Sequence, residues 1–271
     1  MDVTLLGSGD ALGVPAPLCD CEYCRTSERR RRPGLLVEMA GATVVLDVSP
    51  DVKEQLHAIE MPDVNAFFVT HHHFDHAGGL HELNHAAMAF DEHMLNPGAV
   101  ASDERPRKAS FEVFLTPTAC LHLNYSNAHV AKHLDLNLLA HGDAVRVGDM
   151  RVVPFPVDHG RPMFDTLGFA VYHDDAKVVY APDVRGFLPD REAGREYENA
   201  DLLFAEGVAL FRAEGHGSEA ELRSALESAS ADRTVLVNCN EHFQRMSTAE
   251  LRSAAADTEY ELGRDFAEYQ L

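Results

Sequence analysis

The segment Thr70–His76, THHHFDH, places four imidazoles and one carboxylate within seven residues. The apolar run before it is typical of a buried strand. Because side chains alternate along an extended chain, His71 and His73 point the same way and can bind one metal ion. Asp75 and His76 begin the next turn and can reach a second ion. The pattern His-x-His-x-Asp-His therefore predicts a dinuclear metal site, and the alternative is a His-rich solvated loop.

A dinuclear site needs further ligands, and two later strands are followed by candidates. The segment VVPFPVDHG places His159 just after a strand, and KVVYAPDVRG places Asp183 after another, where its carboxylate can bridge two ions. Each residue alone is more typical of a turn, but the His cluster favours the ligand interpretation. Asp47 ends TVVLD, where it is either a partner that orients a ligating His ring or a strand-terminal turn residue.

Three of the five cysteines, Cys19, Cys21 and Cys24, lie within six residues. Three thiolates at this spacing can surround one tetrahedral zinc ion and need a fourth ligand from elsewhere. The alternative is a surface turn with reduced, unliganded thiols. Five is an odd number in a chain with cytosolic character, which argues against a disulfide framework.

The elements that must position these residues alternate between two structural types. Ten short runs rich in Val, Leu, Phe and Tyr predict strands at Val3–Leu6, Leu35–Glu38, Thr43–Asp47, Ala66–Thr70, Phe111–Leu115, Arg151–Phe155, Phe169–Tyr172, Lys177–Ala181, Leu202–Ala205 and Thr234–Val237. Helical patterns predict helices at Asp51–Ile59, Ala77–Phe90, Thr116–His133, Ser218–Ser230 and Ser247–Ala256.

The 271 residues, 45% of them hydrophobic, are enough for one large or two ordinary domains. No Pro/Gly linker separates the two groups of strands. This organisation predicts an α/β fold with two packed sheets and helices outside, a four-layer arrangement in a single domain over residues 1–271. The polar, Pro/Gly-bearing stretch at about 91–110 predicts a long loop or lid.

The formal net charge is −21, and Lys53, Lys108, Lys132 and Lys177 are the only lysines among 23 basic residues. A diffuse acidic surface repels phosphates, which argues against a nucleic-acid partner. Salt at about 1 M screens such repulsion within ~3 Å, so the composition is typical of a halophilic source. We expect a cytoplasmic protein without a membrane segment, because neither a signal peptide nor a long apolar run is present.

The segments THHHFDHAGGL, PVDHG and YAPDVRG together resemble the metallo-β-lactamase superfamily. Within it, LLGSGDALGVPAPLCDCEYC resembles the PhnP phosphodiesterases of the carbon–phosphorus lyase pathway. The resemblance runs from Leu5 to about His242 and is densest in Leu6–Cys24 and Thr70–Leu80. It implies an αββα sandwich, the metallo-β-lactamase fold, with a dinuclear centre at the edge where the two sheets meet.

The resemblance also implies two histidines, three residues apart, in the segment VLVNCNEHFQRM. The first would complete the dinuclear site, and the second would complete the structural zinc site formed by the cysteine turn at about 19–24. This chain has Cys239 at the first position and His242 at the second. Either Cys239 replaces the histidine of the dinuclear site, or a local shift places His242 there.

A further histidine lies in FRAEGHGSEAEL, where His216 precedes Ser218, a good helix N-cap. Such a histidine is usually structural. The resemblance to superfamily phosphodiesterases instead implies that His216 donates a proton or binds the substrate phosphate.

The function expected from these residues is that of a dinuclear, metal-dependent hydrolase with two Zn²⁺ or Mn²⁺ ions and one structural Zn²⁺. His71, His73 and His159 would hold one ion, and Asp75, His76 and a residue of 239–242 the other, with Asp183 between them. By resemblance, a metal-bridged hydroxide attacks a small or cyclic phosphodiester, and Asp75 and His216 are the catalytic residues. We expect a small-molecule substrate. A homodimer is the oligomeric state to test.

Three alternative functions stay open. A carboxylic ester, thioester or lactone hydrolase uses the same ligands but needs no phosphate-binding His216. A tRNA 3′-processing nuclease would need a long inserted arm and a basic patch, and neither is visible in the sequence. A non-catalytic metal or cofactor-binding protein would lack an intact first motif, and Cys239 is the feature that keeps this alternative open.

Overall fold

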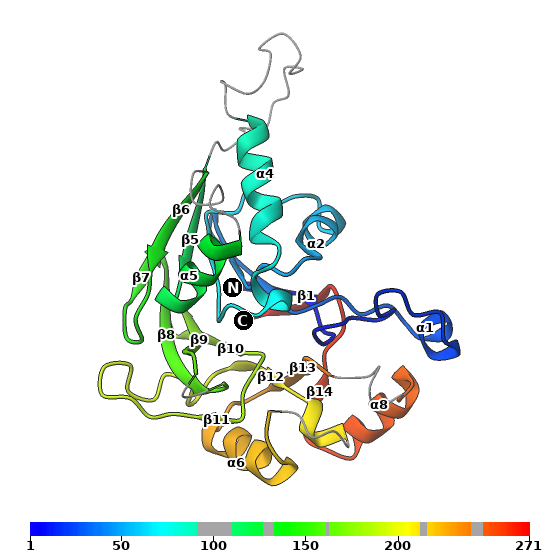
Figure 1. The fold of residues 1–271 in the computed structure, drawn as a ribbon. Coiled ribbons are helices and arrows are strands. Elements are labelled where there is room, and N and C mark those ends of the chain that lie inside the picture. The colour runs from blue at the N-terminus through cyan, green and yellow to red at the C-terminus, as the bar shows by residue number, and fades with distance from the viewer. Residues whose placement is uncertain (91–109, 127–132, 161–162, 212–215, 240–245) are drawn as a thin grey trace.

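The computed structural model describes residues 1–90, 110–126, 133–160, 163–211, 216–239 and 246–271. Two β-sheets pack face to face, and helices cover the outer face of each sheet (Figure 1). The predicted four-layer αββα sandwich is confirmed. No helix among the described residues is long and apolar enough to cross a membrane.

The first sheet has seven strands in the order β15-β1-β2-β3-β4-β5-β6. Their bounds are Asp2–Gly7 for β1, Gly34–Met39 for β2, Ala42–Leu46 for β3, Ala66–Phe68 for β4, Phe111–Leu115 for β5, Leu134–Leu138 for β6 and Ala267–Gln270 for β15. Strands β3 to β6 are parallel, whereas β1 pairs antiparallel with both β2 and β15. The carboxyl ends of β3, β4 and β5 therefore meet at one edge.

The second sheet has eight strands, in the order β11-β8-β9-β10-β12-β13-β14, with β7 paired to β8. Their bounds are Val145–Val147 for β7, Met150–Asp158 for β8, Thr166–His173 for β9, Ala176–Ala181 for β10, Gly186–Phe187 for β11, Leu202–Glu206 for β12, Thr234–Val237 for β13 and Glu261–Leu262 for β14. Strands β10, β12 and β13 are parallel neighbours. Their carboxyl ends also gather at one edge.

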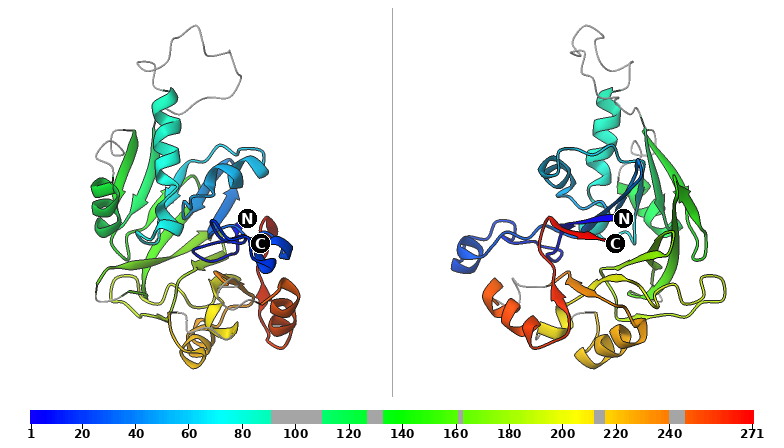
Figure 2. Two further views of the ribbon diagram at one scale, coloured as in Figure 1. Left: turned by 45° about the vertical axis from the view of Figure 1, so that its right-hand side comes forward. Right: turned by 180° about the vertical axis from the view of Figure 1, so that it is seen from behind.

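The described helices are α1 (Glu22–Thr26), α2 (Val52–Ala58), α3 (Phe74–Ala77), α4 (Leu80–Phe90), α5 (Pro117–Ser126), α6 (Glu219–Ala229), α8 (Thr248–Ala256) and the 3₁₀ turn η2 (Val208–Phe211). Helix α6 begins at a capping box, in which Ser218 and Glu221 satisfy each other's backbone N–H groups. Helix α8 begins in the same way. Helix α1, which contains Cys24 of the cysteine turn, projects away from the body of the protein (Figures 1 and 2).

Three apolar clusters hold the four layers together. The largest lies between the two sheets and includes Leu46, Phe68, Phe169 and Phe204, all fully buried. A second joins the first sheet to α2, α4 and α5, and the third joins the second sheet to α6 and α8. Strands buried on both faces read as continuous apolar runs, which is why the sequence shows them clearly.

All ten predicted strands are present, but two helix predictions are partly wrong. The expected helix Ala77–Phe90 divides into α3 and α4 around Gly78–Gly79. A Cβ on Gly79 would lie 2.1 Å from the carbonyl oxygen of Ser49, so this close backbone approach needs glycine. The helix expected over Thr116–His133 ends at Ser126 within the described residues, since His133 already lies in the turn before β6. The predicted lid at 91–110 lies almost wholly outside the described residues.

The short strands β6, β7, β11, β14 and β15 are absent from the sequence prediction. Each has at most five residues, and β15 reads AEYQ, with one buried side chain. Its pairing with β1 brings the two ends of the chain together, and the Met1 amino group lies 2.6 Å from the Leu271 carbonyl oxygen. Apart from β7, which forms a hairpin with β8, these strands are defined by long-range pairing and not by local composition.

The close backbone approach at Gly79 predicts that adding one methyl group there destabilises the protein. The substitution Gly79→Ala should lower the free energy of unfolding by about 1–3 kcal/mol, because the new Cβ meets backbone that cannot rotate away. Chemical denaturation measures the change. The matched control is Gly186→Ala, where an added Cβ meets nothing within 4 Å. Equal stabilities of the two variants would contradict this packing.

Candidate metal centre

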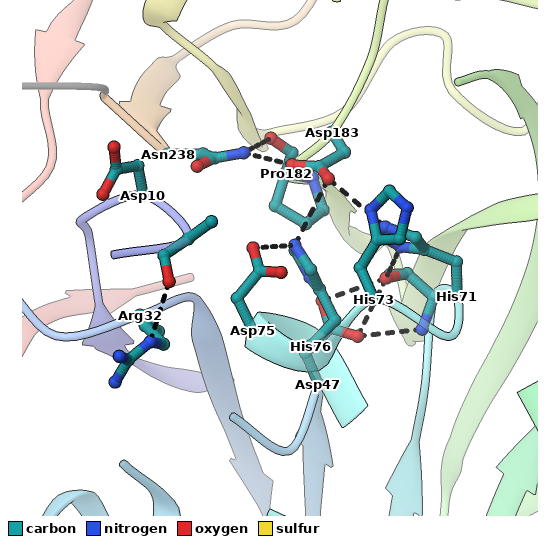
Figure 3. A network of polar contacts seen from close by, with 12 residues as sticks. Asp10, Arg32, Asp47, His71, His73, Asp75, His76, Pro182, Asp183 and Asn238 are labelled. Atoms are coloured by element: carbon teal, nitrogen blue, oxygen red, sulfur yellow. Dashed lines mark hydrogen bonds and ion pairs between the residues drawn. The ribbon is translucent and has the colours of Figure 1, made fainter. Parts of the chain in front are cut away.

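The predicted ligands gather at the edge where the carboxyl ends of the two sheets meet. His159 follows β8. The segment Thr70–His76 leaves β4, and Asp183 follows β10; Figure 3 shows His71, His73, Asp75, His76 and Asp183 together. Because three neighbouring strands of the second sheet end at this edge, residues far apart in the sequence become neighbours. The first sheet contributes the His cluster, and the second sheet contributes His159 and the shared carboxylate.

Three groups of side chains at this edge place their donor atoms within 4.8 Å of one another; two consist of predicted ligands, and the third is Asp183, Glu206 and His216. In the first group, one donor atom each of His71, His73, His159 and Asp183 lie within 4.8 Å of one another. The second group consists of Asp75, His76 and Asp183, with the same spacing. Asp183 belongs to both groups, and it is 3% exposed. The structure thus brings together six of the side chains expected to form a dinuclear site.

Three histidines from the two groups direct a ring nitrogen at one oxygen of Asp183. The Nε2 atoms of His71, His76 and His159 lie 3.4, 3.3 and 3.5 Å from Oδ2 of Asp183. His71 Nε2 and His76 Nε2 are buried and have no hydrogen-bond partner among the described residues. Orphaned polar atoms in a protein interior are costly, and a cation would satisfy both. Imidazole and carboxylate ligands suit Zn²⁺ and Mn²⁺, so the residues fit the expected ions.

The carboxylate of Asp47 orients the ligand rings from behind (Figure 3). Its Oδ2 lies 2.7 Å from Nδ1 of His76, and Oδ1 accepts from the hydroxyl of Thr70 at 2.9 Å. The same hydroxyl lies 3.0 Å from Nδ1 of His71, and the Tyr180 hydroxyl donates to Asp47 Oδ2 at 3.1 Å. With Nδ1 engaged, the Nε2 atom of each ring faces the centre, as ligating histidines require. Of the two interpretations of Asp47, the orienting partner fits this geometry.

Burial and neighbouring charge set the protonation of the first group. Burial, together with the nearby His76, lowers the pKa of His71 to about 3. Burial likewise lowers the pKa of His159 to about 3. Both rings are therefore neutral near pH 7, which is the form that binds metal.

In the second group, neighbouring charges outweigh burial in setting the pKa values. Burial alone would lower the pKa of His76, but the carboxylates of Asp183, Asp75 and Asp47 outweigh it and raise this pKa well above its usual value. Burial would raise the pKa of Asp183, yet His76 and His71 hold it well below its usual range. This dense negative charge around His76 favours a bound cation.

Glu206 was not identified from the sequence. It is the last residue of β12, is 1% exposed, and its Oε2 lies 2.6 Å from Nδ1 of His216. The His216 ring stands perpendicular to the His159 ring, with ring centres 4.0 Å apart. Burial opposes protonation, but Glu206 and Asp183 raise the pKa of His216 to about 9. Its position at a strand end, like that of Asp183, is the one sequence signal that points to Glu206.

The cysteine turn forms a separate cluster. The Sγ atoms of Cys19, Cys21 and Cys24 lie within 4.8 Å of one another, at and just before α1. A backbone hydrogen bond from Cys24 lowers the pKa of the Cys21 thiol, whereas burial raises that of Cys24. Three converging thiols fit one zinc ion and leave one position for a further ligand.

Cys239 and His242 are the two candidates for the ligand that completes a metal site, and the structure describes only Cys239. Cys239 is 1% exposed and belongs to the apolar cluster between the second sheet and its helices. Its Sγ lies 3.7 Å from the carbonyl oxygen of Val237, and neither donor group among the described residues includes it. His242 lies outside the described residues, so its assignment to either site stays a prediction.

The order of strands and ligands agrees with a known family. A model of the family described as "Beta-lactamase superfamily domain" matches residues 42–238, which is more than half of the chain. The chain belongs to the metallo-β-lactamase superfamily. The match includes Asp47, the His cluster, His159, Asp183 and Glu206.

The curated relatives match over part of the chain only. A ribonuclease Z of Methanopyrus kandleri is 29% identical over 142 residues, which are 51% of this chain and 44% of the relative. An octanoyltransferase of Porphyromonas gingivalis is 41% identical over 87 residues, 31% of this chain and 18% of that protein. The chain thus spans less than two thirds of the length of the relatives it matches.

Solved structures match over the whole chain at low identity. A diphosphatase from the PhnP family superposes with a TM-score of 0.77 and 22% identity, covering 100% of this chain and 97% of the other. Zn²⁺-bound PqqB from Methylobacterium extorquens superposes with a TM-score of 0.72 and 17% identity, covering 100% of both chains. At this identity the matches establish the shared fold.

Because Asp183 belongs to both donor groups, its substitution should reduce metal stoichiometry more than substitution of a residue in one group. We expect two Mn²⁺ ions per wild-type chain at this centre, about one in Asp75→Asn and fewer than one in Asp183→Asn, because only Asp183 belongs to both donor groups. Mn²⁺ is the suitable probe, since thiolates select softer ions and the cysteine turn should not bind it. Electron paramagnetic resonance of free Mn²⁺ measures the stoichiometry. Two ions retained by Asp183→Asn would contradict a shared ligand.

Proposed function

We propose that this protein is a dinuclear, metal-dependent hydrolase that cleaves a small or cyclic phosphodiester. The observation that carries this proposal is the pair of donor groups sharing Asp183, with His216 beside them and held by Glu206. The names of two similar proteins, a ribonuclease Z and a PhnP-family diphosphatase, support phosphorus–oxygen cleavage as the reaction class.

The ligand assignment follows the two donor groups. His71, His73, His159 and Asp183 would hold one ion, and Asp75, His76 and Asp183 would hold the other. Two bound cations lower the pKa of water and neutralise the negative charge of a phosphodiester, which otherwise repels a nucleophile. Metal ions also explain how a chain with a net charge of −21 can attract an anionic substrate.

His216 is suited to deliver a proton to the leaving group. Glu206 accepts from Nδ1 of the ring and so fixes its orientation. The other ring nitrogen, Nε2, is then the atom available to donate. Because the ring contacts His159, it lies beside the first donor group, next to the place where a substrate phosphate would bind. Protonation of a departing alkoxide by a positioned side chain contributes roughly 10²–10⁴-fold to a rate.

The role of His216 can be separated from metal binding by the choice of leaving group. Loss of the proton donor should hardly affect bis(p-nitrophenyl) phosphate, whose leaving group is stable as an anion. It should slow the opening of a five-membered cyclic phosphate, which expels an alkoxide, by roughly 10²–10⁴-fold. We expect His216→Ala to show this difference in kcat, and Glu206→Gln to show it more weakly. Assays with Mn²⁺ or Zn²⁺ and with EDTA, in high-salt buffer, measure both substrates.

The controls distinguish the alternative functions. Asp75→Asn should abolish metal-dependent turnover of both phosphodiesters. A folded, metal-loaded protein that cleaves neither phosphodiester but hydrolyses esters, thioesters or lactones would contradict the proposal, and His216→Ala would then leave the rate nearly intact. No turnover of any substrate class would favour a non-catalytic metal-binding role.

A further inference from the structure

The two oxygens of the Asp183 carboxylate have different surroundings. Oδ2 faces the Nε2 atoms of three histidines, at 3.3 to 3.5 Å. Oδ1 points the other way and accepts a hydrogen bond from the side-chain amide of Asn238 (Figure 3). Oδ2 is therefore directed at both donor groups, and Oδ1 is hydrogen-bonded to Asn238.

The orientation of the Asn238 amide is determined by its partners. Its Nδ2 donates to Asp183 Oδ1 and lies 3.3 Å from the carbonyl oxygen of Pro182. Both partners can only accept, so the NH₂ end of the amide must face them. Asn238 is 6% exposed, and a buried amide held by two acceptors has little freedom to turn away.

The backbone explains why the amide reaches Asp183. Asn238 directly follows β13 and has φ of +51°, the left-handed conformation that asparagine tolerates better than most residues. This turn directs the Asn238 side chain toward Asp183, whereas Cys239 packs into the apolar cluster. The amide thus comes from the residue directly before the stretch 239–242, in which we expected a metal ligand.

We propose that Asn238 is a positioning residue that selects which oxygen of Asp183 is presented to the metal ions. Without a donor on Oδ1, the carboxylate could rotate or engage one ion through both oxygens, and it would no longer serve both groups equally. Partners of this kind around ligating side chains typically contribute 10–100-fold to metal affinity. The inference rests on the proposed function only in requiring a metal centre at Asp183.

The fold of the turn itself does not depend on Asn238. Glu206 Oε2 accepts from the backbone N–H of Val184 at 3.1 Å, so the end of β12 independently holds the residue after Asp183. Strand pairing of β10 with β12 also continues up to Ala181. Removal of the Asn238 amide should therefore free the carboxylate without unfolding the segment that carries it.

The test compares two asparagines with the same backbone conformation. In Asn238→Gly, glycine keeps the left-handed backbone without strain and removes only the amide. The matched control is Asn199→Gly, at φ of +54° in an exposed turn distant in sequence from the ligands. Mn²⁺ is titrated into the chelator-treated full chain and followed by electron paramagnetic resonance, with thermal unfolding of each metal-free variant beside it.

We expect Asn238→Gly to bind Mn²⁺ about 10–100-fold more weakly than the wild type, while Asn199→Gly binds like the wild type. Wild-type Mn²⁺ affinity in Asn238→Gly would overturn the proposal. If Asn238→Gly does not fold, Asn238→Ala against Asn199→Ala gives the same comparison with equal backbone cost. Because the readout is metal binding, a failure to hydrolyse phosphodiesters would refute the proposed function without affecting this result.

Discussion

The structure depends on one buried carboxylate that two sets of ligands share. Asp183 is 3% exposed and faces three imidazole nitrogens through a single oxygen. A buried charge is tolerated only where it is paired and hydrogen-bonded, and here every neighbour contributes to that pairing. Asn238 holds one oxygen, Glu206 holds the following backbone N–H, and Asp47 fixes the rings that face the other oxygen. A cation bound between these groups would complete the balance of charge.

The sandwich makes this arrangement possible because parallel strands end together. Strands β10, β12 and β13 are adjacent, and the residues at or just after their ends are Asp183, Glu206 and Asn238. The carboxylates of Asp183 and Glu206 and the amide of Asn238 thus come from three adjacent strands of one sheet. The first sheet supplies the His cluster from the end of β4. The extensive apolar core between the sheets keeps these two edges in register.

Much of this centre is readable from the sequence, because its ligands form a dense local pattern. The spacing in Thr70–His76 predicts the centre directly, and strand ends predict His159 and Asp183. Glu206 also lies at a strand end, but this position alone did not single it out, because it is one acidic residue among 44 and its partner His216 is ten residues away. Asn238 was not identified from the sequence, because the family resemblance implied a ligand at Cys239 or His242 and not at the residue before them. The strands were visible because their runs are apolar, whereas β15 depends on pairing across the whole chain.

The most direct test of this account is a crystal structure of the metal-loaded protein with anomalous diffraction data collected at the absorption edge of the metal. We expect two anomalous peaks beside Asp183, both close to Oδ2, with Oδ1 still hydrogen-bonded to Asn238. One peak belongs near His71, His73 and His159, and the other near Asp75 and His76. A single peak, or a carboxylate of Asp183 that contacts no metal, would contradict the shared dinuclear centre.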